Sequence, residues 1–108
     1  MDEWTRAAAI TDLPDGAPSH VEVEGVDVLL VRTGDRVLGA SNRCTHQGAT
    51  LHRGVVRESG SLLTMTCPIH GSTFQLTDGR VLRGPAVAPL PLFEVRVREG
   101  IVEVRPAS

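Results

Sequence analysis

Several residue types that report on a protein's class are scarce or missing from this 108-residue chain. It contains no lysine and no tyrosine, and two phenylalanines and one tryptophan leave a core that must be largely aliphatic. No apolar run approaches the ~18 residues that a membrane-spanning helix needs. The first residues are acidic, without the basic and apolar regions of a signal peptide. These absences favour a soluble, cytoplasmic protein.

Charge and cysteine content narrow the class further. Eleven basic residues stand against 13 acidic ones, and the formal net charge of −2 gives no reason to expect nucleic acid or a membrane as a partner. Cysteine is limited to Cys44 and Cys67, fewer than a small secreted disulfide scaffold usually carries. The length suits one domain with one modest core. We therefore expect residues 1–108 to form a single domain.

Alternation of apolar and polar residues predicts antiparallel strands. The clearest pair is 93–98 and 101–105, joined by a turn at Glu99-Gly100. Further strands are predicted at 21–24, 26–31, 36–39, 62–66 and 73–76, whereas 6–10 is the only helix-like segment. Short strands in a chain with 11 glycines and 7 prolines indicate an all-β fold, a small antiparallel β-sandwich or barrel. Residues from about 42 to 85 are expected to form a loop-rich insertion in this framework.

Two short segments combine each cysteine with a histidine, Cys44-Thr45-His46 and Cys67-Pro68-Ile69-His70. Three interpretations compete. A Cys44–Cys67 disulfide would not account for a histidine two or three residues after each cysteine. A tetrahedral zinc ion accepts two Cys and two His, although zinc fingers usually group like with like. The third interpretation is an iron–sulfur centre.

The two segments resemble the C-x-H and C-x-x-H motifs of the Rieske family, which hold a 2Fe–2S cluster. The likeness extends to the residues that follow each motif and to Gly84-Pro85-Ala86, and it covers essentially the whole chain. It implies a Rieske fold with a cluster-binding subdomain inserted. It also implies one 2Fe–2S cluster, with one iron held by Cys44 and Cys67 and the other by His46 and His70.

The same resemblance indicates a subtype. High-potential family members carry an extra cysteine in each motif, and these two cysteines form a disulfide; here the positions hold Ala49 and Ile69. Those members also place Ser and Tyr hydroxyls near the cluster sulfurs, where this chain has Ser72 and Phe74. Fewer donors stabilise the reduced cluster less. We therefore predict a reduction potential near about −150 mV rather than ~+300 mV.

The function implied is a soluble Rieske-type ferredoxin, a one-electron carrier rather than an enzyme, with no catalytic residues of its own. By resemblance, it would take electrons from a flavin-dependent ferredoxin reductase and pass them to a terminal oxygenase, as in a dioxygenase system, and work as a monomer. Beyond the cluster motifs only His20 and His52 remain, too few for a second iron site on a compact segment. Two alternatives stay open: a structural or regulatory small subunit of a nitrite-reductase-like enzyme, and an iron–sulfur redox sensor module.

Overall fold

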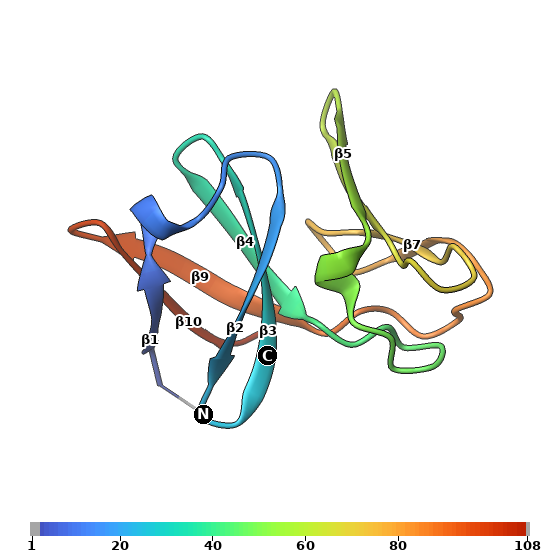
Figure 1. Cartoon of the computed structure of the whole chain (residues 1–108), viewed down its shortest axis with the longest axis horizontal. Coiled ribbons are helices and arrows are strands. Elements are labelled where there is room, and N and C mark those ends of the chain that lie inside the picture. The colour runs from blue at the N-terminus through green and yellow to red at the C-terminus, as the bar shows by residue number, and fades with distance from the viewer. Residues whose placement is uncertain (1–2, 108) are drawn as a thin grey trace.

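The computed structural model describes residues 3–107, which form two antiparallel β-sheets (Figure 1). The larger one, here the base sheet, has the spatial order β1–β10–β9–β4–β3–β2, with bounds β1 (Thr5–Ala9), β2 (Pro18–Val23), β3 (Val26–Thr33), β4 (Arg36–Ser41), β9 (Leu92–Arg98) and β10 (Ile101–Pro106). The smaller one, here the distal sheet, has the order β5–β6–β7–β8, with bounds β5 (Val55–Ser59), β6 (Leu62–Thr66), β7 (Thr73–Gln75) and β8 (Val81–Arg83). Two single 3₁₀ turns complete the elements, η1 (Ile10–Asp12) and η2 (Leu51–Arg53). The all-β prediction is confirmed.

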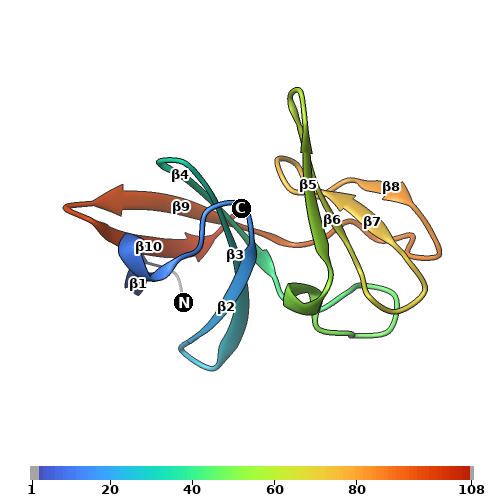
Figure 2. The same cartoon turned by 45° about the horizontal axis from the view of Figure 1, so that its top comes forward.

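The distal sheet belongs to the chain segment between β4 and β9. Figure 2 shows the two sheets lying side by side, and the chain runs between them through the segments that leave β4 and return to β9. These two segments meet, because the backbone N–H of Ser41 donates to the carbonyl oxygen of Pro91 at 2.8 Å. Next to this contact, Gly39 pairs with Phe93 and Ala40 with Leu92. The base sheet therefore fixes both ends of the segment that carries the cysteines and histidines.

Alternation explains the best-predicted strands. In β10, Val102 and Val104 are fully buried in the core of the base sheet. The residues between them point the other way, so that Glu103 accepts a hydrogen bond from Arg96 of β9 at 2.7 Å. Because the period of a strand is two, one face packs and the other forms ion pairs.

Two local features were not predicted from the sequence. Residues 6–10, the helix-like segment, form strand β1 and the first residue of η1, because β1 pairs along β10. Tertiary pairing here outweighs the helix propensity of three consecutive alanines. Strand β5 was not predicted, and the segment expected to be rich in loops holds a four-stranded sheet.

The hydrophobic core has two parts. One fills the base sheet, and the other lies between the two sheets, where it includes both cysteines together with Leu51, Met65 and Phe74. Phe74 and Met65 come from neighbouring strands of the distal sheet and are fully buried. Cys44 and Cys67 are thus set into packed apolar surroundings.

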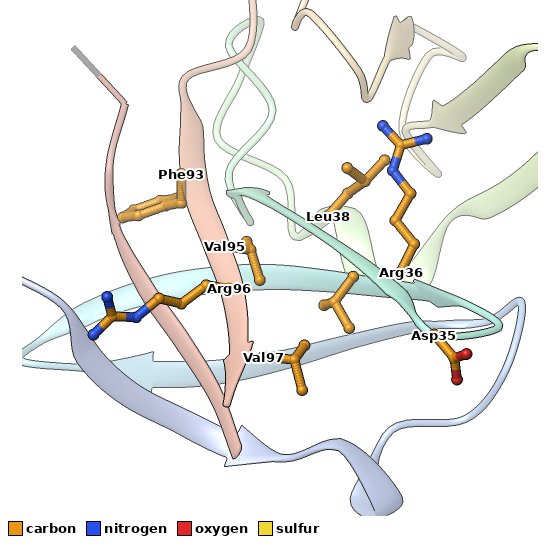
Figure 3. Close-up of a pocket in the computed structure, with 8 residues that line it drawn as sticks. Asp35, Arg36, Leu38, Phe93, Val95, Arg96 and Val97 are labelled. Carbon is orange, nitrogen blue, oxygen red and sulfur yellow. The ribbon is translucent and has the colours of Figure 1, made fainter. Parts of the chain in front are cut away.

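A hollow of about 410 Å³ opens where β4 and β9 diverge beyond their short ladder (Figure 3). Val37, Val95 and Val97 are among the side chains that line it, together with the charged residues Asp35 and Arg36. It lies at the start of β4, whereas the cysteine-bearing loop follows the end of that strand. No helix within residues 3–107 is long and apolar enough to cross a bilayer.

Candidate metal centre

The first cysteine lies in a tight loop, residues 43–50, whose two ends meet at Asn42 and Leu51. The backbone N–H of Leu51 donates to the carbonyl oxygen of Asn42 at 2.8 Å and closes the loop. Inside it, the N–H of Cys44 donates to the carbonyl of Ala49 at 2.8 Å, and the N–H of Gly48 donates to the carbonyl of Cys44, also at 2.8 Å. Gly48 has a φ of +71°, which suits a residue without a Cβ. We call this segment the first loop.

The second loop, residues 68–71, follows β6. It is closed by the N–H of Cys67, which donates to the carbonyl oxygen of Ser72 at 2.7 Å. Its last two residues, His70 and Gly71, have φ values of +67° and +77°. A left-handed histidine is uncommon, and such conformations concentrate at functional sites. Here the turn brings the His70 ring to the protein surface.

The structure brings the four residues together as two pairs. Cys44 and Cys67 are 4% and 2% exposed, and both are free thiols. His46 and His70 are exposed, and their ring centroids lie 5.7 Å apart with an interplanar angle of 61°. Within residues 3–107, no three Cys, His, Asp or Glu side chains gather closely enough to hold one metal ion. The thiols form a pair in the core and the imidazoles form a pair at the surface.

Burial also sets the electrostatics of the thiols. Burial raises the pKa of the Cys67 thiol above its usual value, and the adjacent Cys44 thiol raises it further, while the backbone N–H of Ile69 opposes the rise. A thiol with a raised pKa stays protonated at neutral pH unless a positive charge compensates for the thiolate. A bound metal ion would supply that compensation, because a coordinating thiol is deprotonated outright.

A third segment, residues 84–89, covers the side of the two loops. The N–H of Ala86 donates to the hydroxyl oxygen of Ser72 at 3.0 Å, and the hydroxyl of Thr45 donates to the carbonyl of Ala88 at 2.7 Å. The segment is thereby bonded to both loops. Between these anchors Val87 is 93% exposed.

The donor chemistry fits a 2Fe–2S cluster of mixed ligation. Each iron of such a cluster takes two protein ligands, so the residues are needed as two separate pairs rather than as one group of four. Cys44 and Cys67 would hold the iron on the buried side, and His46 and His70 would hold the iron on the exposed side.

The structure places the two remaining histidines together, which the sequence did not indicate. His20 lies within β2, rather than ahead of the first strand, and His52 lies in η2. Their rings stack at 3.7 Å with an interplanar angle of 12°. Asn42, also overlooked in the sequence, is fully buried beside them. Asparagine is common in loops, so only its burial marks it out.

Both the sequence and the fold of this chain resemble those of known proteins. The model of the Rieske [2Fe-2S] domain family matches residues 3–94. Ferredoxin CarAc of Metapseudomonas resinovorans is 34% identical over 94% of this chain and 92% of its own length. The solved ferredoxin of carbazole 1,9a-dioxygenase from Nocardioides aromaticivorans is 32% identical, covers 98% of this chain and 100% of its own, and superposes with a TM-score of 0.88.

Two further solved structures of similar fold come from proteins with different described functions. One is a complex of reduced oxygenase and oxidised ferredoxin in carbazole 1,9a-dioxygenase, matched with a TM-score of 0.80 and 32% identity over 94% of this chain and 91% of that one. The other is described as the small subunit of an NADH-dependent nitrite reductase from Mycobacterium tuberculosis, with a TM-score of 0.84 and 33% identity over 100% and 99% of the two chains. Matched over most of its length by the family model and by ferredoxins of that kind, the chain belongs to the Rieske [2Fe-2S] domain family.

Proposed function

We propose that this chain is a one-electron carrier, a ferredoxin that binds a single 2Fe–2S cluster through Cys44, Cys67, His46 and His70. The observation that carries this proposal is the opposite placement of the two ligand types. The thiols lie in the core between the sheets, and the imidazoles lie at the surface. Once bound, such a cluster supplies one-electron oxidation and reduction.

Each ligand pair has its own task. The buried Cys44 and Cys67 would shield the cluster from water, and their two thiolates would offset part of the positive charge of the irons. Because His46 and His70 are neutral ligands, they leave the oxidised centre without net charge. Adding an electron to a neutral centre costs less than adding one to a dianion, so the histidines raise the reduction potential above that of a four-cysteine site.

The exposed imidazoles are also the proposed exit for the electron. Electron transfer needs close approach of donor and acceptor, and the rings of His46 and His70 reach the surface side by side. Exposed apolar side chains lie in the adjoining segments: Ile69 precedes His70 and is 47% exposed, and Val87, 93% exposed, lies in the segment bonded to Thr45 and Ser72. A partner that docks on the surface around His46 and His70 would cover these apolar side chains and exclude water between the two redox centres.

The partners follow from the likeness to dioxygenase ferredoxins. The related carbazole ferredoxin is seen bound to its oxygenase, and we assign a terminal oxygenase as acceptor here as well. The donor would be a flavin-dependent ferredoxin reductase. We expect the chain to act as a monomer in the cytoplasm.

The cofactor and its ligands can be tested on protein purified without oxygen. We expect about two irons and two acid-labile sulfides per chain, together with the EPR spectrum of a mixed Cys–His cluster in the reduced state. Replacing His46 or His70 with alanine should abolish that spectrum. The matched control is His20→Gln, which changes an exposed histidine outside the site and should leave the spectrum intact. One zinc per chain in place of iron would contradict the assignment.

A second candidate is a small subunit of a nitrite-reductase-like enzyme. The 33% identity to the Mycobacterium tuberculosis protein favours it. A protein that folds fully but purifies colourless and free of iron would support this structural or regulatory function, whereas an intact cluster that accepts electrons from a reductase supports the carrier.

A further inference from the structure

Asn42 connects the base sheet to the first loop through its backbone and its side chain. Its N–H donates to the carbonyl of Asp27 at 3.1 Å, and its carbonyl closes the first loop by accepting from Leu51. The side chain repeats this pattern, because its Nδ2 donates to Asp27 Oδ2 at 3.0 Å and its Oδ1 accepts the N–H of His52 at 2.8 Å. The residue has no exposed surface. Asn42 is therefore the point at which the first loop is held to the framework.

These bonds determine where the proton of His52 is. The amide oxygen of Asn42 must face the backbone N–H of His52, so both hydrogens of Nδ2 point to the other side. One goes to Asp27 and the other to Nδ1 of His52, 2.9 Å away. Nδ1 therefore accepts, and the neutral ring carries its proton on Nε2. A proton added to Nδ1 would set two N–H donors against each other.

Several charged or titratable groups surround the His52 ring. His20 of β2 stacks on it at 3.7 Å, and Asp27 at the start of β3 pairs with His20 Nδ1 at 3.4 Å. Arg43, which follows β4, lies 3.8 Å from Asp27, and Arg53 follows His52 in η2. Glu22 of β2 lines the same hollow as His20, Asp27 and Arg43. Stacked imidazoles 3.7 Å apart repel strongly if both are charged.

We propose that Asn42 is a positioning residue for the first loop, and that it holds the loop fully only while His52 is neutral. Protonation of His52 breaks the Asn42–His52 bond and loosens the loop that carries Cys44 and His46. This inference rests on the proposed function, since it assumes that the loop holds the cluster. Its consequence is a ligand loop that is anchored at neutral pH and released in acid.

The pKa of His52 is shifted in the direction that keeps its ring neutral near pH 7, as the proposal requires. Burial lowers the pKa of His52 below its usual 6.5, His20 and Arg53 lower it further, and Asp27 partly opposes them. A histidine whose pKa is lower in the folded state than in the unfolded state stabilises the fold fully above pH 6.5. That contribution is lost as the pH falls through the folded-state pKa.

The first experiment follows cluster release from the oxidised holoprotein in the presence of an iron chelator, by loss of visible absorption, between pH 5.5 and 7.5. For the wild type we expect release to accelerate as the pH falls, by up to about tenfold per pH unit near the titration of one group. His52→Gln, whose amide oxygen accepts from Asn42 but does not titrate, should flatten this dependence. His20→Gln is the matched control: it should retain a pH dependence, shifted to higher pH because the charge of His20, which lowers the pKa of His52, is removed. Equal pH dependence in H52Q and the wild type, or its loss in H20Q, would overturn the proposal.

Asn42→Ala separates positioning from general destabilisation. If Asn42 transmits the state of His52, N42A should release its cluster at the fast, acid-like rate at every pH. If Asn42 has only a structural role, N42A should release faster by a constant factor and keep the wild-type pH dependence, which contradicts the proposal.

The protonation state of His52 can also be measured directly on the wild type, so this test does not depend on whether a variant folds. The ¹⁵N shifts of the His52 ring in the oxidised wild type at pH 7.5 should show Nε2 protonated and Nδ1 unprotonated. A proton on Nδ1 would overturn the inference. Iron and sulfide are measured on the same sample, so that an iron-free wild type contradicts the proposed function, whereas a cluster-bearing protein with the other tautomer contradicts only the inference about Asn42.

Discussion

The hydroxyl oxygen of Ser72 accepts the backbone N–H of Ala86 at 3.0 Å, and this bond ties the second loop to the segment that covers it. Because the oxygen acts as an acceptor there, the hydroxyl hydrogen of Ser72 remains free to point elsewhere. The residue has no exposed surface and directly follows the second loop. Its hydroxyl is the polar group that we expect to donate to a cluster sulfur.

The reduction potential should lie near the low end of the family range. Phe74, fully buried, supplies no hydroxyl where high-potential members have Tyr, and no disulfide links the loops because Ala49 and Ile69 occupy those positions. We expect a value near about −150 mV by protein-film voltammetry, and a value above about +200 mV would refute the subtype.

Substitution of the two second-loop neighbours should move the potential in opposite directions. Ser72→Ala removes a donor and should lower the potential, and Phe74→Tyr adds a hydroxyl and should raise it. The S72A change also leaves the N–H of Ala86 without its acceptor, so its unfolding is measured in parallel. If the reduction potential is unchanged in both variants, neither side chain lies close enough to the cluster sulfurs to donate to them, which contradicts the prediction.

Val87 tests the docking surface. Val87→Asp puts a charge on a 93% exposed apolar side chain in the segment that is bonded to Thr45 and Ser72, and it should slow electron transfer to the oxygenase while the potential stays the same. The control is Val97→Asp, at a 38% exposed valine in the hollow of the base sheet (Figure 3). Equal transfer rates for V87D and the wild type would show that partners dock elsewhere.

Gly54 lets η2 approach the end of β6. A Cβ at this position would lie 1.9 Å from the carbonyl oxygen of Thr66, the residue before Cys67. Gly54→Ala should therefore cost at least about 2 kcal/mol of unfolding free energy, because backbone must move. Gly16→Ala is the control, since a Cβ there meets nothing within 4 Å and only the φ of +77° is unfavourable, at about 1 kcal/mol. Chemical denaturation of both variants measures the difference, and equal costs would contradict the clash.

Trp4 should contribute to stability and not to electron transfer. The guanidinium carbons of Arg96 and Arg105 lie 4.4 Å and 4.5 Å from its ring centroid, and each contact is worth about 0.5–1 kcal/mol at a partly exposed site. Trp4→Leu should lower the unfolding free energy by about 1–2 kcal/mol. The rate of reduction by the reductase should not change, and a large fall would instead indicate that Trp4 carries electrons.

The strands that could be predicted are those whose pattern is local. Residues 93–98 and 101–105 alternate on both faces and share a two-residue turn, and the structure pairs them along their whole length. Strand β1 and strand β5 lack such a pattern. They are strands because β10 and β6 supply their hydrogen bonds. The pattern of residues within one segment does not reveal which other strand it will pair with.

The candidate site divides in the same way. Cys44 is close in sequence to His46, and Cys67 to His70, so both segments stood out, and their resemblance to the Rieske motifs implied that they bind a cluster. The contact of His20 with His52 crosses 32 residues and exists only because β2 lies against η2. The importance of Asn42 depends on burial, which its sequence neighbours do not reveal.

The bond between Ser41 and Pro91 has an evolutionary consequence. The 49 residues between Ser41 and Pro91 leave and re-enter the base sheet at one point, so the framework already bears the entropy cost of bringing the two ends together. Loops within that excursion can lengthen, shorten or change their ligands without shifting the register of the strands that frame them. The same base sheet can thus carry many different inserted segments. A chimera that joins this base sheet to the segment of a relative that corresponds to residues 42–90 should fold.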